Sequence, residues 1–190
     1  AFSITFDYRF DRYGFFDDPL RRVVLEEAAA QWEAIIQDEF DDLPAGLSFD
    51  LRNPSGPGAE TVTLTDPVDD LIIFVGAYAL DGSILALAGP DGGSAAGDAF
   101  AARISPDFRG TGPVSDFEPW AGVISFDLDA RWYVGFGQPA AKQNDFLSVA
   151  VHEIGHVLGI GTSGTFDSWS VGTKFTGPNA QSLNQGWPFR

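Results

Sequence analysis

Apolar and polar residues alternate at period two along residues 2–10, FSITFDYRF, which is typical of a half-buried β-strand. Residues 46–52, GLSFDLR, and residues 122–129, GVISFDLD, show the same strand-like character. Residues 70–80, DLIIFVGAYAL, are almost continuously apolar, which indicates a strand covered on both faces. The pattern therefore predicts a β-sheet assembled from distant parts of the chain.

Two stretches instead carry apolar residues at spacings of three and four, the pattern of a helix with one core-facing side. The first, residues 18–40, opens with an aspartate in the N-cap position and a proline at the first helical position. The second, residues 142–161, can be capped by Asn144 or Asp145 and ended by Gly159. Strands and helices together predict an α/β (α+β) fold.

The region between the last strand and the preceding ones, residues 89–120, is rich in Gly, Pro, Ser and Asp. We interpret it as long surface loops and not as a linker, because a strand pattern resumes directly after it. With 190 residues, 44% of them hydrophobic, the chain has enough apolar mass for one ordinary core. We therefore expect a single domain spanning residues 1–190.

The charge excludes some partners. Eleven Lys and Arg face 27 Asp and Glu, giving a net charge of −16, so nucleic acid and anionic membrane surfaces would be repelled. No apolar run approaches the roughly 20 residues of a membrane-spanning helix. The chain has no Met and opens at Ala1, and with its acidic composition this leads us to expect a secreted, extracellular protein that has lost a signal peptide.

The second predicted helix carries the only two histidines, His152 and His156. They are four residues apart, about one turn, so both imidazoles leave one face and can converge on one ion. Glu153 lies roughly 100° further round the helix, where it can reach a water on that ion and act as a general base. Such residues also occur as plain surface residues of a helix, but the apolar flanks favour a zinc site.

The run from His152 to Gly159, HEIGHVLG, resembles the first eight residues of the metzincin zinc-peptidase motif H-E-x-x-H-x-x-G-x-x-H. Upstream, residues 121–132, AGVISFDLDARW, resemble the segment that precedes the active-site helix in matrixins. The resemblance implies a metzincin-like catalytic domain with a twisted mixed sheet of the five-stranded type and two long helices, the second carrying the zinc motif. It also implies a zinc metalloendopeptidase with Glu153 as the general base and a protein or peptide as substrate.

The sequence departs from this family at three places. Thr162 stands where the motif has its third histidine, and Ser125 stands where matrixins have a ligand of a structural zinc. The methionine of the turn beneath the metzincin zinc is also missing. The structural zinc is therefore expected to be absent, and the third catalytic ligand is left open.

Two hypotheses address that third ligand. In leishmanolysin-like metzincins it follows an inserted segment, which residues 159–184 resemble, so the favoured expectation is a histidine beyond Arg190 and an incomplete C-terminal subdomain. The alternative is an oxygen ligand within the chain, with Asp167 as the candidate.

Two further features follow from the resemblance. Residues 83–89, SILALAG, resemble the edge strand along which metzincins align an extended substrate, although a plain strand explains them equally well. Asp127 corresponds to a matrixin calcium ligand, but Ala130 replaces the accompanying glutamate and Asp129 is only a substitute. Calcium is thus a weaker prediction than zinc, as are further loop ligands at Asp91, Asp98 and Asp107.

A function of another class stays open. The chain can be a secreted binding or adhesion module that kept the peptidase scaffold and lost catalysis, which would explain the missing third ligand.

Overall fold

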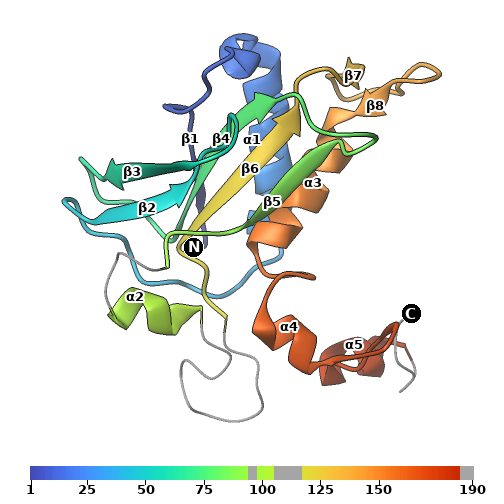
Figure 1. Ribbon diagram of the computed structural model, residues 1–190. Coiled ribbons are helices and arrows are strands. Elements are labelled where there is room, and N and C mark those ends of the chain that lie inside the picture. The colour runs from blue at the N-terminus through green and yellow to red at the C-terminus, as the bar shows by residue number, and fades with distance from the viewer. Residues whose placement is uncertain (94–97, 105–116, 185–190) are drawn as a thin grey trace.

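The computed structural model describes residues 1–93, 98–104 and 117–184 (Figure 1). Its principal sheet has the strand order β1-β4-β6-β5, with β1 (Ile4–Asp7), β4 (Leu71–Tyr78) and β6 (Ala121–Asp127) parallel. β5 (Ala86–Pro90) runs antiparallel to β6 at one edge. The predicted mixed sheet is confirmed, whereas the expected five strands are not, because within the described residues this sheet has four.

The strand expected at residues 46–52 pairs elsewhere. β2 (Ser48–Arg52) forms an antiparallel hairpin with β3 (Ala59–Thr63), a strand that the sequence pattern does not predict. The hairpin packs on one face of the principal sheet, where Phe49 contacts Phe74 and Trp120 with ring centroids 6.0 and 4.9 Å apart. This hairpin gives the sheet a second, smaller core.

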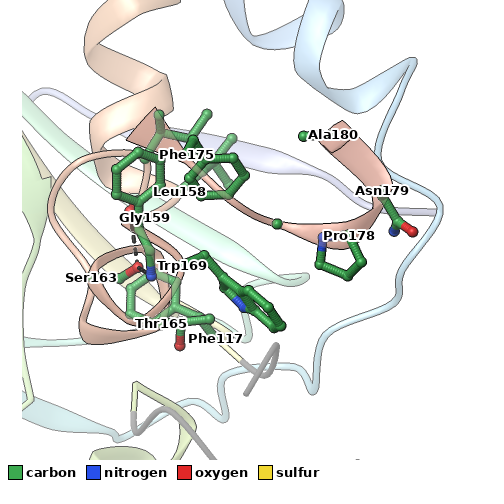
Figure 2. A pocket seen from close by; sticks show the side chains of 13 residues that line it. Phe117, Leu158, Gly159, Ser163, Thr165, Trp169, Phe175, Pro178, Asn179 and Ala180 are labelled. Carbon is green, nitrogen blue, oxygen red and sulfur yellow. Dashed lines mark hydrogen bonds between the residues drawn. The ribbon is translucent and has the colours of Figure 1, made fainter. Parts of the chain in front are cut away.

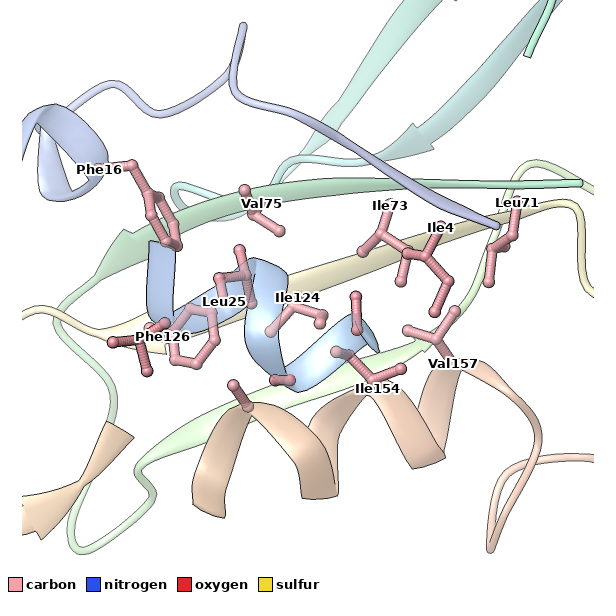
Figure 3. Packing of buried hydrophobic residues seen from close by; sticks show 14 of the residues in the cluster. Ile4, Phe16, Leu25, Leu71, Ile73, Val75, Ile124, Phe126, Ile154 and Val157 are labelled. Carbon is pink, nitrogen blue, oxygen red and sulfur yellow. The ribbon is translucent and has the colours of Figure 1, made fainter. Parts of the chain in front are cut away.

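The opposite face is covered by α1 (Pro19–Glu33) and α3 (Phe146–Val157), as Figure 3 shows. Leu25 of α1 and Ile154 of α3 are fully buried against Ile73 and Ile124 of the sheet. The indole Nε1 of Trp32 also donates to the carbonyl of Val151 at 2.9 Å, which joins the two helices directly. The larger core therefore fixes α3 against both the sheet and α1.

α1 is shorter than the helix predicted over residues 18–40. It ends at Glu33. In the longer predicted helix Asp38 and Glu39 would lie in the last turn, where their charge is unfavourable at the negative end of the helix dipole. Phe40 is buried against Phe2, and its backbone N–H donates to Asp70 at 2.6 Å. These tertiary contacts replace the helical hydrogen bonds that the sequence pattern predicts.

Gly122 of β6 allows α3 to lie close to the sheet. A Cβ at this position would lie 2.3 Å from Cγ1 of Val157, the last residue of α3. Any larger residue would therefore push away the end of the helix that carries His156.

The remaining elements are short. They are a 3₁₀ helix (Phe15–Asp17), α2 (Asp98–Arg103), β7 (Trp132–Tyr133), β8 (Asn144–Asp145), α4 (Gly164–Ser168), β9 (Ser170–Val171), β10 (Lys174–Phe175) and α5 (Pro178–Leu183). Among the residues described, no helix has the length and apolar character needed to cross a membrane.

Candidate metal centre

Residues that the sequence pattern identifies start α3 and set its orientation. Asp145 is the N-cap, and its carboxylate accepts the backbone N–H of Ser148 at 3.3 Å. Phe146, Ala150, Ile154 and Val157 are buried and set the face of α3 that meets the core. The rotation of the helix about its axis is therefore fixed, and with it the direction of the two histidines.

His152 and His156 leave α3 side by side. Their ring centroids are 4.5 Å apart and the ring planes are almost perpendicular, at 87°. His152 is exposed and His156 is half-buried, so neither ring is enclosed among aliphatic side chains. The structure thus brings together the two predicted metal ligands on an accessible side of the helix.

The ring of His156 is held by a backbone carbonyl. Its Nδ1 lies 2.7 Å from the carbonyl oxygen of Ile160. A carbonyl only accepts hydrogen bonds, so Nδ1 is the donor, and in the neutral ring Nε2 then carries the lone pair that a metal needs. A metal-binding histidine ordinarily has this arrangement, with the second nitrogen donating to a carbonyl or carboxylate.

Glu153 lies between the histidines in sequence but turns inward. It is 6% exposed, and burial raises the pKa of its carboxyl, although the nearby His156 and His152 act in the opposite direction. A buried carboxyl with a raised pKa is suited to accept and return a proton near neutral pH. This environment fits the predicted general base.

The turn after α3 places the Ile160 carbonyl. Gly159 adopts φ +96°, the Gly159 N–H donates to His156 O at 3.1 Å, and the Ile160 N–H donates to Gly155 O at 2.9 Å. These two bonds make a Schellman motif, the C-terminal turn that a left-handed glycine permits. The sequence pattern predicts Gly159 as the end of the helix, but it does not predict the carbonyl that this turn brings to His156.

Among the residues that the structure describes, no third ligand lies near the histidines. Asp167 is exposed on α4, and its backbone N–H donates to Ser163 O at 3.0 Å. Within the described part of the chain, the one group of three side chains able to share an ion is Glu39, Asp69 and Asp70. Asp167 therefore does not join the two histidines, and Thr162 turns its hydroxyl to a backbone carbonyl.

That acidic group has structural partners. Asp70 accepts the backbone N–H groups of Ser3 at 2.8 Å and Phe40 at 2.6 Å, and Glu39 pairs with the N-terminal amine at 2.8 Å. These carboxylates hold the first strand in place.

The predicted calcium ligands gain no support. Asp127 accepts the N–H groups of Leu80 at 3.0 Å and Asp129 at 3.4 Å, and Asp91 pairs with Arg52 at 2.7 Å. Both carboxylates thus order local backbone and side chains. Asp107 and the side chain of Asp98 lie outside the described residues.

An apolar pocket of about 480 Å³ borders the C-terminal end of α3 (Figure 2). Its wall combines the end of the helix with the segment that follows. The aromatic residues in the lining are Phe117, Phe166, Trp169 and Phe175. Nothing in the sequence pattern predicts this pocket, because its residues come from several short elements.

Comparison with known families gives one match. The matrixin family model matches residues 106–173, a stretch that contains β6 and α3 with both histidines and Glu153. This match supports a metzincin-type family of zinc metallopeptidases. Neither a search of curated proteins nor a search of solved structures found a match.

Proposed function

We propose that this chain is a zinc-dependent metalloendopeptidase in which His152 and His156 bind the metal and Glu153 is the general base. The observation that carries this proposal is the pair of adjacent rings on α3, with the Nδ1 of His156 engaged by the Ile160 carbonyl. Two imidazoles one turn apart are a donor set that suits zinc. The matrixin match over the same helix supports the assignment.

In the proposed reaction, zinc and Glu153 have different roles. A zinc ion, when bound, supplies a Lewis acid that acidifies water and polarises a peptide carbonyl. Glu153 takes the proton from the attacking water and passes it to the nitrogen of the leaving amine. Burial raises the pKa of this carboxyl, which makes the acceptance of that proton easier.

We also propose that β5 aligns an extended peptide substrate. In its antiparallel pairing with β6, the Asp127 N–H donates to Leu85 O and the Asp91 N–H donates to Ala121 O. Odd-numbered residues of β5 therefore face β6, and the backbone groups of Ala86 and Ala88 face outward. A peptide that pairs with these outward groups would add a strand to the sheet.

The third ligand is proposed to come from residues that follow Arg190. The support is that, among the described residues, no third His, Asp or Glu side chain is placed to share an ion with the two rings. A longer polypeptide should therefore bind zinc more tightly than residues 1–190. Equal affinity of the two would contradict this proposal.

The variant Glu153→Gln tests the activity. With the base removed but the ligands kept, hydrolysis of an unfolded protein such as casein should fall by about 10²–10⁴-fold, while zinc uptake is unchanged. Glu27→Gln is the matched control, because Glu27 is exposed on α1. Wild-type hydrolysis by Glu153→Gln would contradict the role of Glu153.

The second candidate is a binding module without catalysis, which the same lack of a third donor favours. In that case, wild type and Glu153→Gln would bind peptides equally and hydrolyse none, even in a longer polypeptide loaded with zinc.

Secretion is a separate proposal, supported by the net charge of −16. Its test is the appearance of the protein in the medium of the cells that make it.

A further inference from the structure

Thr162 stands six residues after His156, at the position where the metzincin motif has its third histidine. Its side chain is exposed but directed back toward α3, and its Oγ1 donates to the carbonyl oxygen of His156 at 2.5 Å. The same carbonyl accepts the Gly159 N–H at 3.1 Å. One hydroxyl thus connects the end of the turn to His156, which is proposed to bind metal.

The turn that this hydroxyl closes contains the acceptor of His156. Residues 159–162 leave α3 at Gly159 and return at Thr162, and the Ile160 carbonyl between them lies 2.7 Å from Nδ1 of His156. Gly161 lies against the ring as well, since a Cβ there would be 3.7 Å from Cε1 of His156. The contacts form a closed loop from His156 backbone to Thr162, along the turn to Ile160, and back to the His156 ring.

Two glycines give this turn a flexible backbone, so side-chain hydrogen bonds are needed to hold its conformation. Gly159 and Gly161 have φ values of +96° and +74°, and glycine has more backbone freedom than any other residue. Ser163 Oγ donates to Gly159 O at 2.9 Å and holds the start of the turn. Thr162 holds its other end, next to the histidine itself.

We propose that Thr162 is a positioning residue that keeps the Ile160 carbonyl on Nδ1 of His156, and so keeps Nδ1 as the hydrogen-bond donor of the ring and Nε2 as the nitrogen open to a metal. The position that would supply a ligand in the metzincin motif here orders another ligand. This role concerns the metal site of the proposed function, but the ring tautomer can be measured on the metal-free chain.

The experiment compares Thr162→Val with Thr162→Ser. Long-range ¹H–¹⁵N spectra of the metal-free protein report which ring nitrogen carries the proton, and the chain has only two histidines to assign. Wild type and Thr162→Ser should show His156 protonated at Nδ1, whereas Thr162→Val should show a mixture of tautomers. Zinc titration should then give about tenfold weaker binding for Thr162→Val.

Thr176→Val is the matched control. Thr176 Oγ1 also donates to a backbone carbonyl, that of Trp169 at 2.7 Å, in the same C-terminal part of the chain. It should keep the wild-type tautomer and zinc affinity. A wild-type spectrum and affinity for Thr162→Val, or equal losses in Thr162→Val and Thr176→Val, would overturn the positioning role.

The test separates this inference from the proposed function. If Thr162→Val changes the tautomer while none of the proteins binds zinc, the positioning role stands and the proposed metal site fails. If all bind zinc equally and the tautomer never changes, the metal site stands and the role of Thr162 fails.

Discussion

α3 and the segment after it are held in place by different means. Ile154 and Val157 are fully buried in the larger core, whereas α4 and α5 in the following segment bury no residue. That segment is held by hydrogen bonds such as those of Thr162 and Ser163 and by partly buried rings such as the stacked pair Phe166 and Phe175. The candidate metal centre lies where the two regions meet, since the core orients the helix that carries both histidines and the segment after it supplies the acceptor for His156.

The largest contrast should appear on truncating one apolar side chain in each region. Ile154→Ala removes a fully buried side chain of α3 and should lower the free energy of unfolding by about 2–5 kcal/mol. Leu183→Ala, in α5, removes a side chain that is 85% exposed and should change it by less than about 0.5 kcal/mol. Denaturant unfolding of both variants measures the difference, and similar losses would show that the two regions are packed alike.

Proline substitutions in β5 sharpen the comparison at the sheet edge. Leu87→Pro removes an N–H that faces β6 and should cost about 3 kcal/mol or more. Ala88→Pro removes an outward N–H, which edge strands tolerate, so its main effect should be a raised KM for peptide hydrolysis. Thermal unfolding and peptidase kinetics separate the two effects. An unchanged KM in Ala88→Pro would argue against substrate pairing at this edge.

Gly122→Ala tests how closely α3 must approach the sheet. The new Cβ would meet Val157 Cγ1 at 2.3 Å, and such overpacking should cost about 1–3 kcal/mol. Val157→Ala in the same chain removes the clashing atom, so the double variant should be less destabilised than the sum of the two single variants. Strict additivity of the unfolding free energies would show that this contact does not set the helix position.

The smallest effect concerns the free-energy cost of ionising Asp70, which is buried in the packed region. Burial raises the pKa of Asp70 above its ordinary value, against the hydrogen bonds from Ser3 and Phe40. The folded protein then holds this proton more tightly than the unfolded chain, so the stability that protonation gives is lost as pH rises through the folded pKa. Asp70→Asn lacks this titration. Its unfolding free energy should fall less steeply than that of wild type from about pH 4 upward, and parallel pH profiles would contradict the shift.

The sequence predicts the packed region well because burial leaves a pattern. The apolar patterns at residues 70–80, 122–129 and 142–161 each correspond to an observed strand or helix whose ends differ from the predicted ones by one to four residues. The spacing of His152 and His156 predicts their adjacency, since α3 is a regular helix. Where long-range contacts decide the backbone, as at Phe40, the pattern predicts too long a helix.

The rest of the site leaves no such pattern. A backbone carbonyl such as that of Ile160 has no sequence signature, and only the glycines at 159 and 161 indicate that the chain turns back there. The hydroxyl of Thr162 is equally hidden, because threonine occurs in many solvent-exposed turns. The metzincin motif predicts a metal ligand at position 162, and it cannot predict that the residue there binds the backbone instead.

Zinc titration followed by the NMR signals of the two histidine rings tests the central claim most directly. If His152 and His156 bind one ion together, both sets of ring nitrogen signals should shift in parallel and stop changing at one zinc per chain. Signals that stay fixed, or that shift at different zinc concentrations, would contradict a shared metal centre on α3.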